Sequence, residues 1–407
     1  RHLYYSSNFI LFNSNINNWK YYCRYFTSYL RSTRKAELNF MEKTSNLQNS
    51  YFSLVKKRFL KNRVGILGLV FVSFLIFTAV FADFLSPYDP AARDSDRVFY
   101  PPQGIHFFDQ DNNFSLRPFA YGFIEGFDPD TFEPIMEIDY TQKNYLYFFT
   151  KGWEYKFLGL NLDIHLFTTK DGSKVFFIGS DAYGRDMLSR IFKGSRVTLL
   201  FALIVVSITT FIGILVGISS GYFSGKFDIA TQRVTELALA FPDLPLYLSL
   251  VAILPRQMDP FLIFIFMAFI LSSLRWAQLS REVRGKTLSL RRLDYIKAAE
   301  ALGSNDLRII YRHLLPNVTS HVIVSVSLLI PSVILTESFF SFLGLGIQSP
   351  FVSWGLQLNS AQDLRTIGSY PWVLSPVFAI LISVLGFNAL GDALRDAIDP
   401  YATTTKK

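Results

Sequence analysis

The chain has 407 residues, of which 50% are hydrophobic, 16% are aromatic and only 18% are charged. The charged fraction is low for a soluble domain, so the chain is expected to be a polytopic membrane protein if its apolar runs are long enough. The single cysteine, Cys23, excludes a disulfide framework and a cysteine-based metal site.

The formal net charge of +8 raises the question of a nucleic-acid partner. The basic residues, however, gather beside the long apolar runs. Lys56, Lys57 and Arg58 precede the first run, and Arg291 and Arg292 follow a later one. Anionic lipid headgroups and the enrichment of Lys and Arg in cytoplasmic loops explain this placement, so no nucleic-acid partner is expected.

About six apolar runs approach or exceed the roughly 20 residues that a helix needs to cross a bilayer. They are residues 64–84, 197–219, 234–254, 260–279, 322–342 and 372–390. The predicted fold is an all-α polytopic membrane protein with about six transmembrane helices. Pro242 and Pro245 in the third run predict a kink there.

The charges beside these runs predict the topology. Basic residues before the first run place the N-terminus inside, and alternation then places both termini in the cytoplasm. The first run lacks a small-residue cleavage site, so it should remain as an anchor. Residues 1–40 show no useful periodicity and precede Met41, and we expect them to be a non-native or disordered extension.

Residues 86–180 separate the first two runs and should lie outside the cytoplasm. Acidic residues outnumber basic ones in this insert, which permits translocation. Residues 141–150 and 173–180 are rich in aromatic and β-branched residues and are separated by turn residues, which predicts a small β-rich extracytoplasmic domain. Two roles stay open: a lid on the outer mouth of the membrane domain, or direct contact with a substrate or a binding protein.

Residues 281–319 form a basic, polar loop that should face the cytoplasm. Within it, Ala298 and Ala299 offer small side chains, Gly303 permits a turn, and Pro316 closes the segment. The pattern predicts a helix, a turn at the glycine and a second short helix. Such a helix has a small-residue face against which another protein could pack closely.

Enzyme chemistry finds no support in the sequence. Gly285-Lys286-Thr287 lacks the glycine and the preceding strand of a phosphate-binding loop, so the chain is not expected to hydrolyse ATP. The histidines have no ligand spacing, and no nucleophile elbow or zinc-protease motif occurs. We therefore expect no catalytic residue, no metal and no cofactor in this chain.

Glu337 is the most informative carboxylate within an apolar run. Ionisable groups inside a membrane are costly and often line a pathway. Glu337 is therefore a candidate for the pathway or for a polar contact at a helix junction, with a position near the headgroups as the alternative.

The loop resembles a known motif. Residues 295–303, reading YIKAAEALG, are followed after nine residues by His313-Leu314-Leu315-Pro316, and this spacing is similar to the EAA loop of permease subunits of bacterial ABC importers. Lys297 stands where the family often has Glu, and His313 stands where it often has Ile. These departures bear on individual contacts and leave the spacing intact.

Further motifs resemble the second permease of dipeptide, oligopeptide and nickel importers. They are Gly179-Ser180-Asp181, Gly184-Arg185-Asp186 and Leu188-Ser189-Arg190 before the second run, then residues 276–285, 341–346, 354–355 and 391–400. The resemblance covers the chain from Lys56 to about Pro400, apart from the insert, and several motifs occur in the same order.

The resemblance implies a permease that pairs with a second, homologous permease in the bacterial inner membrane. Two ATPase subunits, which bind ATP and Mg²⁺, would dock below, and a periplasmic or lipoprotein binding protein would deliver the solute. The implied ATPase-coupling residues are Tyr295, Ala298, Ala299, Glu300, Gly303, Leu315 and Pro316. The implied solute is a dipeptide or oligopeptide. Nickel, another small solute, or an ATPase-independent transporter or channel are the alternatives.

The expected organisation therefore has six parts. In chain order they are the extension at 1–40, a cytoplasmic segment at 41–63, the first transmembrane helix at 64–85, the extracytoplasmic insert at 86–180, the core permease domain at 181–400 with its loop at 281–319, and a cytoplasmic tail at 401–407.

Overall fold

The computed structural model describes residues 53–127, 134–170, 173–255 and 257–398. Two compact units are present: Arg63–Arg395 holds the apolar helices and the sheet, and the remainder of the chain forms the other. In that second unit, residues 53–62 and 396–398 are described, and residues 53–59 are helical. The extension expected at residues 1–40 lies outside the described residues.

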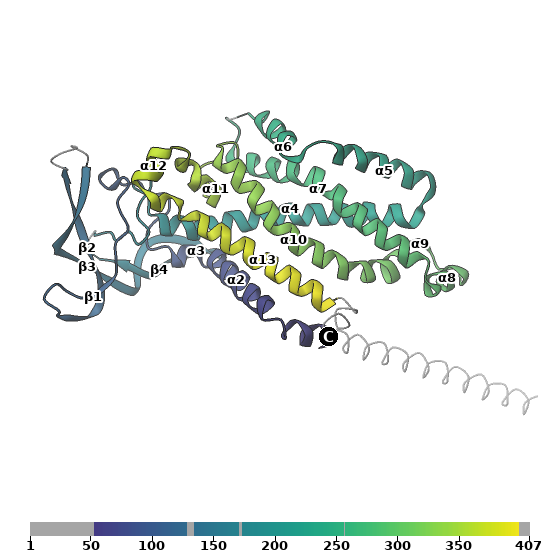
Figure 1. Cartoon of the computed structure of the whole chain (residues 1–407), viewed down its shortest axis with the longest axis horizontal. Helices are drawn as coiled ribbons and strands as arrows, with labels where there is room; N and C mark the ends of the chain where they lie inside the picture. The colour runs from purple at the N-terminus through teal and green to yellow at the C-terminus, as the bar shows by residue number, and fades with distance from the viewer. Residues whose placement is uncertain (1–52, 128–133, 171–172, 256, 399–407) are drawn as a thin grey trace, which may run out of the picture. The chain divides into compact units, whose positions relative to one another are not determined.

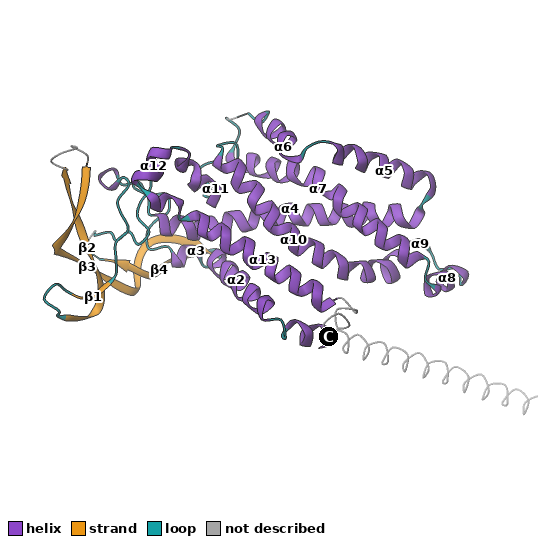
Figure 2. Cartoon of the chain, viewed as in Figure 1, coloured by secondary structure: helices purple, strands orange, loops and turns teal. Residues whose placement is uncertain are grey.

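Long helices dominate the larger unit (Figure 2). In the described part of the chain, five are long and apolar enough to cross a membrane: α2 Arg63–Val80, α4 Met187–Phe223, α7 Pro260–Arg291, and the segments Asp306–Phe342 and Pro371–Ile398. A bent pair, α5 Gly225–Ala240 and α6 Asp243–Ala252, makes a sixth candidate. The two helices of this pair meet at 82°, and the break falls at Pro242, one of the prolines that predicted a kink.

The span Asp306–Phe342 consists of α9 Asp306–Ile309, the π-helix Ile310–Leu314 and α10 Leu315–Phe342, and the last span consists of the 3-10 turn Pro371–Leu374 and α13 Pro376–Ile398. Shorter elements complete the helical part (Figure 1). They are α3 Ala82–Leu85, α8 Asp294–Ala301, α11 Trp354–Gln357, α12 Leu364–Ser369, and the 3-10 turns Ser95–Arg97 and Leu358–Gln362. The expectation of a mostly helical chain with about six apolar spans is confirmed.

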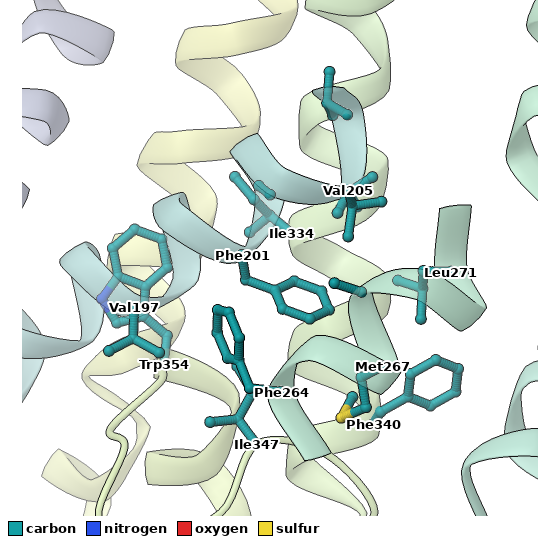
Figure 3. Close-up of a cluster of buried hydrophobic side chains, with 14 of the residues drawn as sticks. Val197, Phe201, Val205, Phe264, Met267, Leu271, Ile334, Phe340, Ile347 and Trp354 are labelled. Atoms are coloured by element: carbon teal, nitrogen blue, oxygen red, sulfur yellow. The ribbon is translucent and has the colours of Figure 1, made fainter. Parts of the chain in front are cut away.

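The main core lies where α4, α7 and α10 meet, and Figure 3 shows its side chains. The rings of Phe201 on α4 and Phe264 on α7 meet edge to face with centroids 5.3 Å apart. Trp354, from the short helix α11, is fully buried beside them, and its indole N–H donates to the carbonyl of Ile191 at 3.0 Å. Burial of these large aromatic groups, with the polar N–H satisfied, holds the three helices together.

Glycines let α4 approach α7 closely. Gly213, Gly217 and Gly221 recur every fourth residue and so share one face of α4. A Cβ atom added at Gly217 would lie 2.7 Å from the carbonyl oxygen of Ser280 and 2.7 Å from the Cβ of Val283. The backbones are therefore in contact along this face, as small-residue stripes allow in membrane helices.

The insert contains a four-stranded antiparallel sheet with the order β1-β2-β3-β4. Its strands are β1 His106–Phe108, β2 Phe114–Phe127, β3 Pro134–Phe157 and β4 Leu160–Thr169. In register, Phe119 of β2 faces Tyr145 of β3, and Tyr147 of β3 faces Thr168 of β4. The predicted β-rich insert is present, and residues 141–150 lie in β3 as expected.

Residues 173–180 are the exception, because the strand predicted there is wrong. Only Ser180 makes an isolated bridge, to Asp186. The apolar side chains of Val175 and Phe176 are buried, and the backbone of Phe176 pairs with Gln103 instead of a strand. The segment is an extended, buried connection that leads to the start of α4, so its apolar residues reflect burial and not a strand.

The start of α4 is held by carboxylates. Asp186 caps the helix, since its Oδ2 accepts hydrogen bonds from the backbone N–H and the hydroxyl of Ser189 at 2.8 and 2.6 Å. Burial raises the pKa of this carboxyl group to about 6. Asp181 accepts from the guanidinium of Arg185 at 2.7 Å. The motif residues at this end thus build the junction between the insert and α4.

The sheet is attached to the same junction. The ring of His165, fully buried on β4, lies 3.0 Å from the carbonyl oxygen of Asp83 through Nδ1 and 2.8 Å from that of Trp153 through Nε2. The carboxylate of Asp83 pairs with Lys193 and Arg196 on α4, both at 2.5 Å. A single acidic residue therefore connects α3, the short helix after the first apolar helix, with the sheet and α4.

The glycine contact makes a testable difference between two positions. Gly217→Ala should lower the free energy of unfolding by about 1–3 kcal/mol, because its methyl group enters the contact with α7. Gly285→Ala, on α7, should be neutral or stabilising by up to about 1 kcal/mol, since a Cβ there meets nothing within 4 Å. Thermal unfolding of the detergent-solubilised protein measures both. Equal stability of the two variants would contradict the packing described.

Candidate functional site

The loop between α7 and α10 begins with α8, the amphipathic helix that carries the two alanines. Ile296 anchors α8, because its side chain is fully buried. It belongs to a second cluster, here called the loop core, formed by Ile218, Tyr222, Leu279, Val283, Leu290, Ile296, Ile309, Leu314, Val318 and Val322. The helix therefore lies on the ends of α4, α7 and α10 with one face and leaves the other exposed.

Gly303 ends this helix as the pattern predicted. Its φ is +74°, its N–H donates to the carbonyl of Glu300 at 2.9 Å, and the next N–H, of Ser304, donates to the carbonyl of Ala299 at 3.1 Å. This pair of bonds is a Schellman motif, which satisfies the last carbonyls of a helix and requires a left-handed residue. A Cβ at this glycine would meet nothing within 4 Å, so the backbone angle, and not space, requires glycine.

The second short helix differs from the prediction. After an N-cap at Asn305, α9 runs through the π-helix Ile310–Leu314 directly into α10, and the whole segment Asp306–Phe342 is one candidate span. Pro316 therefore does not close the loop but lies in the first turn of α10. Its ring cannot donate to the preceding turn, and the π turn just before it accommodates the interruption.

The structure divides the predicted coupling residues into two groups. Tyr295, Ala298, Glu300, Gly303 and Pro316 are exposed. Ala299 and Leu315 are half-buried and pack against the loop core. The last two therefore position the loop from beneath, and the first five form part of its accessible surface.

Lys297 and Tyr295 illustrate the exposed face. Lys297 is exposed, and no carboxylate of the described residues lies within 4.0 Å of it. Partial burial raises the pKa of the Tyr295 phenol, whose ring lies 6.1 Å from that of His313. The position at which the family often has Glu thus points away from the rest of this chain.

Three large apolar side chains on this loop were missed by the sequence reasoning. Leu302 is 87% exposed, Leu307 is 65% exposed and Tyr311 is 71% exposed. Together with Ala298 they add apolar side chains to an exposed surface that is otherwise largely polar and charged. The sequence did contain a signal for them. The spacing of Ile296, Ile309 and Leu314 indicates which face of the loop is buried, and the two leucines lie outside that face in an otherwise polar loop.

A polar network joins the loop to α4. The hydroxyl of Tyr222, near the end of α4, donates to Oδ1 of Asp306 at 2.7 Å. The guanidinium of Arg291 lies 5.6 Å from the centre of the Tyr222 ring and donates to the hydroxyl of Ser224 at 2.9 Å. The start of α9 is therefore bonded to the helix that reaches the insert at its other end.

A second contact fixes the start of α5. Arg284 on α7 forms a two-pronged ion pair with Asp228, with both nitrogen–oxygen distances at 2.6 Å. The hydroxyl of Ser220 on α4 donates to the same carboxylate at 2.5 Å. Paired donors of this kind fix geometry as well as charge, so α4, α5 and α7 meet in a defined arrangement beside the loop.

Glu337 lies at a helix junction. Its side chain is fully buried on α10, and Oε1 accepts from the hydroxyl of Ser341 at 2.7 Å. The hydroxyls of Thr198, Ser338 and Ser353 surround the same carboxyl group. Gly355 of α11 approaches the backbone of Ser338 so closely that a Cβ would lie 2.5 Å from it. These contacts place Glu337 where α10 meets α4 and α11, and its depth in a membrane stays a prediction.

The residues that suggested enzyme chemistry have other surroundings. Gly285-Lys286-Thr287 lies within α7, and the hydroxyl of Thr287 donates to the carbonyl of Val283 along the helix. No group of three or more His, Cys, Asp or Glu side chains able to hold a metal ion occurs in the described ranges.

Comparisons with known proteins agree with this geometry. Residues 213–403 match the family described as "Binding-protein-dependent transport system inner membrane component". Residues 50–102 match the "N-terminal TM domain of oligopeptide transport permease C". The first match covers the loop and the apolar helices around it, and the second covers the first apolar helix.

The chain also matches curated relatives, and each match covers most of the relative's length. The glutathione transport system permease protein GsiD of Pectobacterium atrosepticum is 37% identical over 228 residues, which cover 56% of this chain and 73% of that protein. The chain belongs to this family of binding-protein-dependent transport permeases. The oligopeptide transport system permease proteins OppC of Bacillus subtilis and Haemophilus influenzae are 34% and 40% identical, over 57% and 55% of this chain and 73% and 70% of theirs.

Membership of the family accounts for the apolar helices. The chain is a multi-pass membrane permease, a component of a transport system. The resemblance that the EAA spacing and the motifs before α4 indicated is confirmed. The sheet between α3 and α4 falls between the two matched regions, as the sequence reasoning expected for the insert.

The bond between Tyr222 and Asp306 can be measured. A double-mutant cycle with Tyr222→Phe and Asp306→Ala should give a coupling energy of about 1–2 kcal/mol in thermal unfolding, because the acceptor is charged and the bond is partly buried. Tyr311→Phe is the matched control, since that ring is largely exposed, and it should change stability by less than about 0.5 kcal/mol. A coupling energy near zero would contradict the link between the loop and α4.

Proposed function

We propose that the chain is the transmembrane permease subunit of an ATP-driven importer and forms half of a translocation pathway for dipeptides or oligopeptides. The printed names of its relatives, which are permeases of oligopeptide and glutathione transport systems, support this assignment. A second, homologous permease would form the other half. Two separate ATPase subunits would bind ATP and Mg²⁺, and a binding protein would deliver the solute.

The loop carries this proposal. It exposes the apolar side chains of Ala298 on α8, Leu302 at the end of α8, Leu307 on α9 and Tyr311 in the π-helix, and the loop core beneath anchors all three elements. An exposed apolar surface on a rigid support suits docking into a groove of another protein. We assign this surface to the ATPase contact, with Tyr295, Glu300 and Gly303 beside it.

The contacts of the loop suggest how motion would pass into the membrane. A displacement of α8 by the closing ATPases would act on the loop core beneath it and, through Asp306 and Tyr222, on the end of α4. Because α4 is one helix of 37 residues packed against α7, it would move as a rigid body. Rigid-body rocking of helices around a fixed site is how other transporters alternate access.

Orientation follows from the same assignment. The ATPases would lie in the cytoplasm, so the loop and both termini would face inside the bacterial inner membrane, in line with the basic residues of residues 281–319. The sheet, attached at the opposite end of α4, would then lie outside the cytoplasm, on the side from which a binding protein delivers the solute.

Uptake in a deletion strain tests the function. The wild-type gene should restore uptake of labelled di- and oligopeptides, and ATPase subunits should co-purify with the chain. Failure to restore peptide uptake while nickel uptake returns would refute the peptide assignment. Transport without any co-purifying ATPase would refute the importer itself.

Gly303 separates coupling from assembly. Gly303→Val should lower uptake at least about tenfold while membrane insertion stays normal, because a β-branched residue at φ +74° is strained by roughly 1–2 kcal/mol or more and distorts the end of α8. Gly303→Asn, which tolerates the left-handed angle, should keep most of the activity. The readouts are uptake and ATP hydrolysis in the same vesicles, and normal uptake by the valine variant would refute the docking role.

Removal of the sheet deletes the contact of His165 with Asp83 but keeps the bonds of Asp181 and Asp186 at the start of α4. Gln103 and Phe176 are bonded to each other, so a short Gly-Ser linker can replace residues 105–173. The shortened chain should still co-purify with the ATPases, whereas stimulation of ATP hydrolysis by the loaded binding protein should fall severalfold. Loss of ATPase association would show that the two ends are not separate in function.

A further inference from the structure

Arg275 lies within the apolar part of α7. It is four residues, about 6 Å along the axis, before the end of the apolar run 260–279, beyond which α7 carries Arg281, Glu282 and Arg284. A charged side chain within an apolar run is costly, and such residues face the bundle interior or a water-filled space. Arg275 therefore needs a polar partner.

Hydroxyl groups are the partners that this chain supplies. Nη1 of Arg275 donates to the hydroxyl of Ser332 at 2.7 Å, and Nη2 donates to that of Thr336 at 2.8 Å. Nε is buried and has no hydrogen-bond partner among the described residues. No carboxylate of the described residues lies within 4.0 Å of the guanidinium either. The positive charge is hydrogen-bonded but not neutralised.

Polar side chains continue along the same two helices. The carboxylate of Glu282 accepts from Gln278 at 3.1 Å and from Ser325 at 2.8 Å, and it lies 3.7 Å from Nε2 of His321. We define the polar stripe as Arg275, Gln278, Glu282, His321, Ser325 and Ser332. Gln278, His321 and Ser332 are exposed. Glu282 and His321 lie just beyond the apolar runs 260–279 and 322–342, whereas Arg275, Ser325 and Ser332 lie within them. Lipid tails offer no hydrogen bonds to the groups within the runs, so these groups meet water or protein.

An open cleft of about 450 Å³ lies beside Arg275. It is formed by α6, α10 and α13, and it places the hydroxyls of Ser332 and Thr336 beside the apolar side chains of Leu244, Phe339 and Val384. Apolar walls with a few convergent polar groups, at this volume, are typical of small-molecule sites.

We propose that the polar stripe lines the solute pathway and that Arg275 and Ser332 bind the carboxylate of a passing solute. This inference rests on the proposed function. A guanidinium presents paired donors that match a carboxylate, and the exposed hydroxyl of Ser332 marks where the cleft gives access to it. The apolar wall accepts the side chain beside that carboxylate. A small peptide, which carries one carboxylate and variable side chains, fits both features.

The cleft favours a solute over a carboxylate of the partner permease. Its walls come from three helices of this one chain, and its volume is that of a small-molecule site. The experiment distinguishes these two sources.

Cysteine labelling in the assembled importer tests the stripe. In a Cys23→Ser background, which removes the only cysteine, Ser325→Cys and Ser332→Cys should react with membrane-impermeant thiosulfonates. Ile323→Cys, an exposed apolar position on the same helix, should not react. Lack of reaction at both serine positions, in every nucleotide state, would overturn the proposal and would indicate a face covered by the partner permease.

The charge of the reagent tests Arg275. At Ser332→Cys, an anionic thiosulfonate should react about tenfold faster than a cationic one, since the unneutralised guanidinium attracts the anion. Adding Arg275→Gln should abolish that preference, and adding Arg275→Lys should keep it. Lys226→Gln removes an exposed charge elsewhere and should leave the preference unchanged. An equal preference with and without Arg275 would refute the role of the guanidinium.

Uptake supplies an independent readout. Arg275→Gln should lower uptake of a dipeptide about tenfold while the ATP hydrolysis stimulated by the loaded binding protein is kept, and Arg275→Lys should restore uptake. Uptake by Arg275→Gln equal to that of the wild type would refute solute binding. If the Arg275→Gln variant no longer co-purifies with the second permease, the carboxylate that Arg275 binds belongs to that subunit and not to the solute. If the wild type transports no peptide, the proposed function is refuted. Labelling at Ser325 and Ser332 then still shows whether the polar stripe is accessible to water.

Discussion

The contact between α4 and α7 is the constraint on which the rest of the structure depends. Gly213, Gly217 and Gly221 bring the two backbones together, and the aromatic rings of Phe201 and Phe264 continue the contact into the main core. Because α4 has 37 residues, its two ends lie about 54 Å apart. One end carries Asp186 and the junction with the sheet, and the other carries Tyr222 and the bond to the loop. Side chains larger than glycine at these three positions would push α4 away from α7.

Patterns within one segment could be predicted from the sequence, and patterns set by distant segments could not. The apolar runs and the turn at Gly303 depend on local composition and on one backbone angle, so both were found. Residues 173–180 resemble a strand in composition, but burial against the start of α4 decides their structure. Arg275 was passed over because its partners, Ser332 and Thr336, lie more than fifty residues away in the chain. The continuous helix through Pro316 was not predicted, because a π turn has no distinctive pattern of apolar residues in the sequence.

Two ionisable side chains inside the apolar helices differ in their access to solvent. Glu337 is enclosed by hydroxyl groups at a junction where Gly355 lets a second helix approach, and no solvent reaches it. Arg275 has hydroxyl partners too, but one of them is exposed at a cleft. Burial without access suits a structural role, since exchange with a ligand would require the junction to open. An accessible charged group without an ion-pair partner is suited to bind a ligand reversibly.

The π turn at Ile310–Leu314 has a consequence for the helix that follows it. The fully buried residues of this segment are Ile309, Leu314 and Val318, separated by five residues across the turn and by four after it. The additional residue keeps the same side of the helix directed at the loop core although the hydrogen-bond pattern changes. Return of that turn to α-helical pattern would rotate α10 by about one residue, roughly 100°, relative to α9. The rotational position of α10, which carries Ser325 and Ser332, therefore depends on this turn.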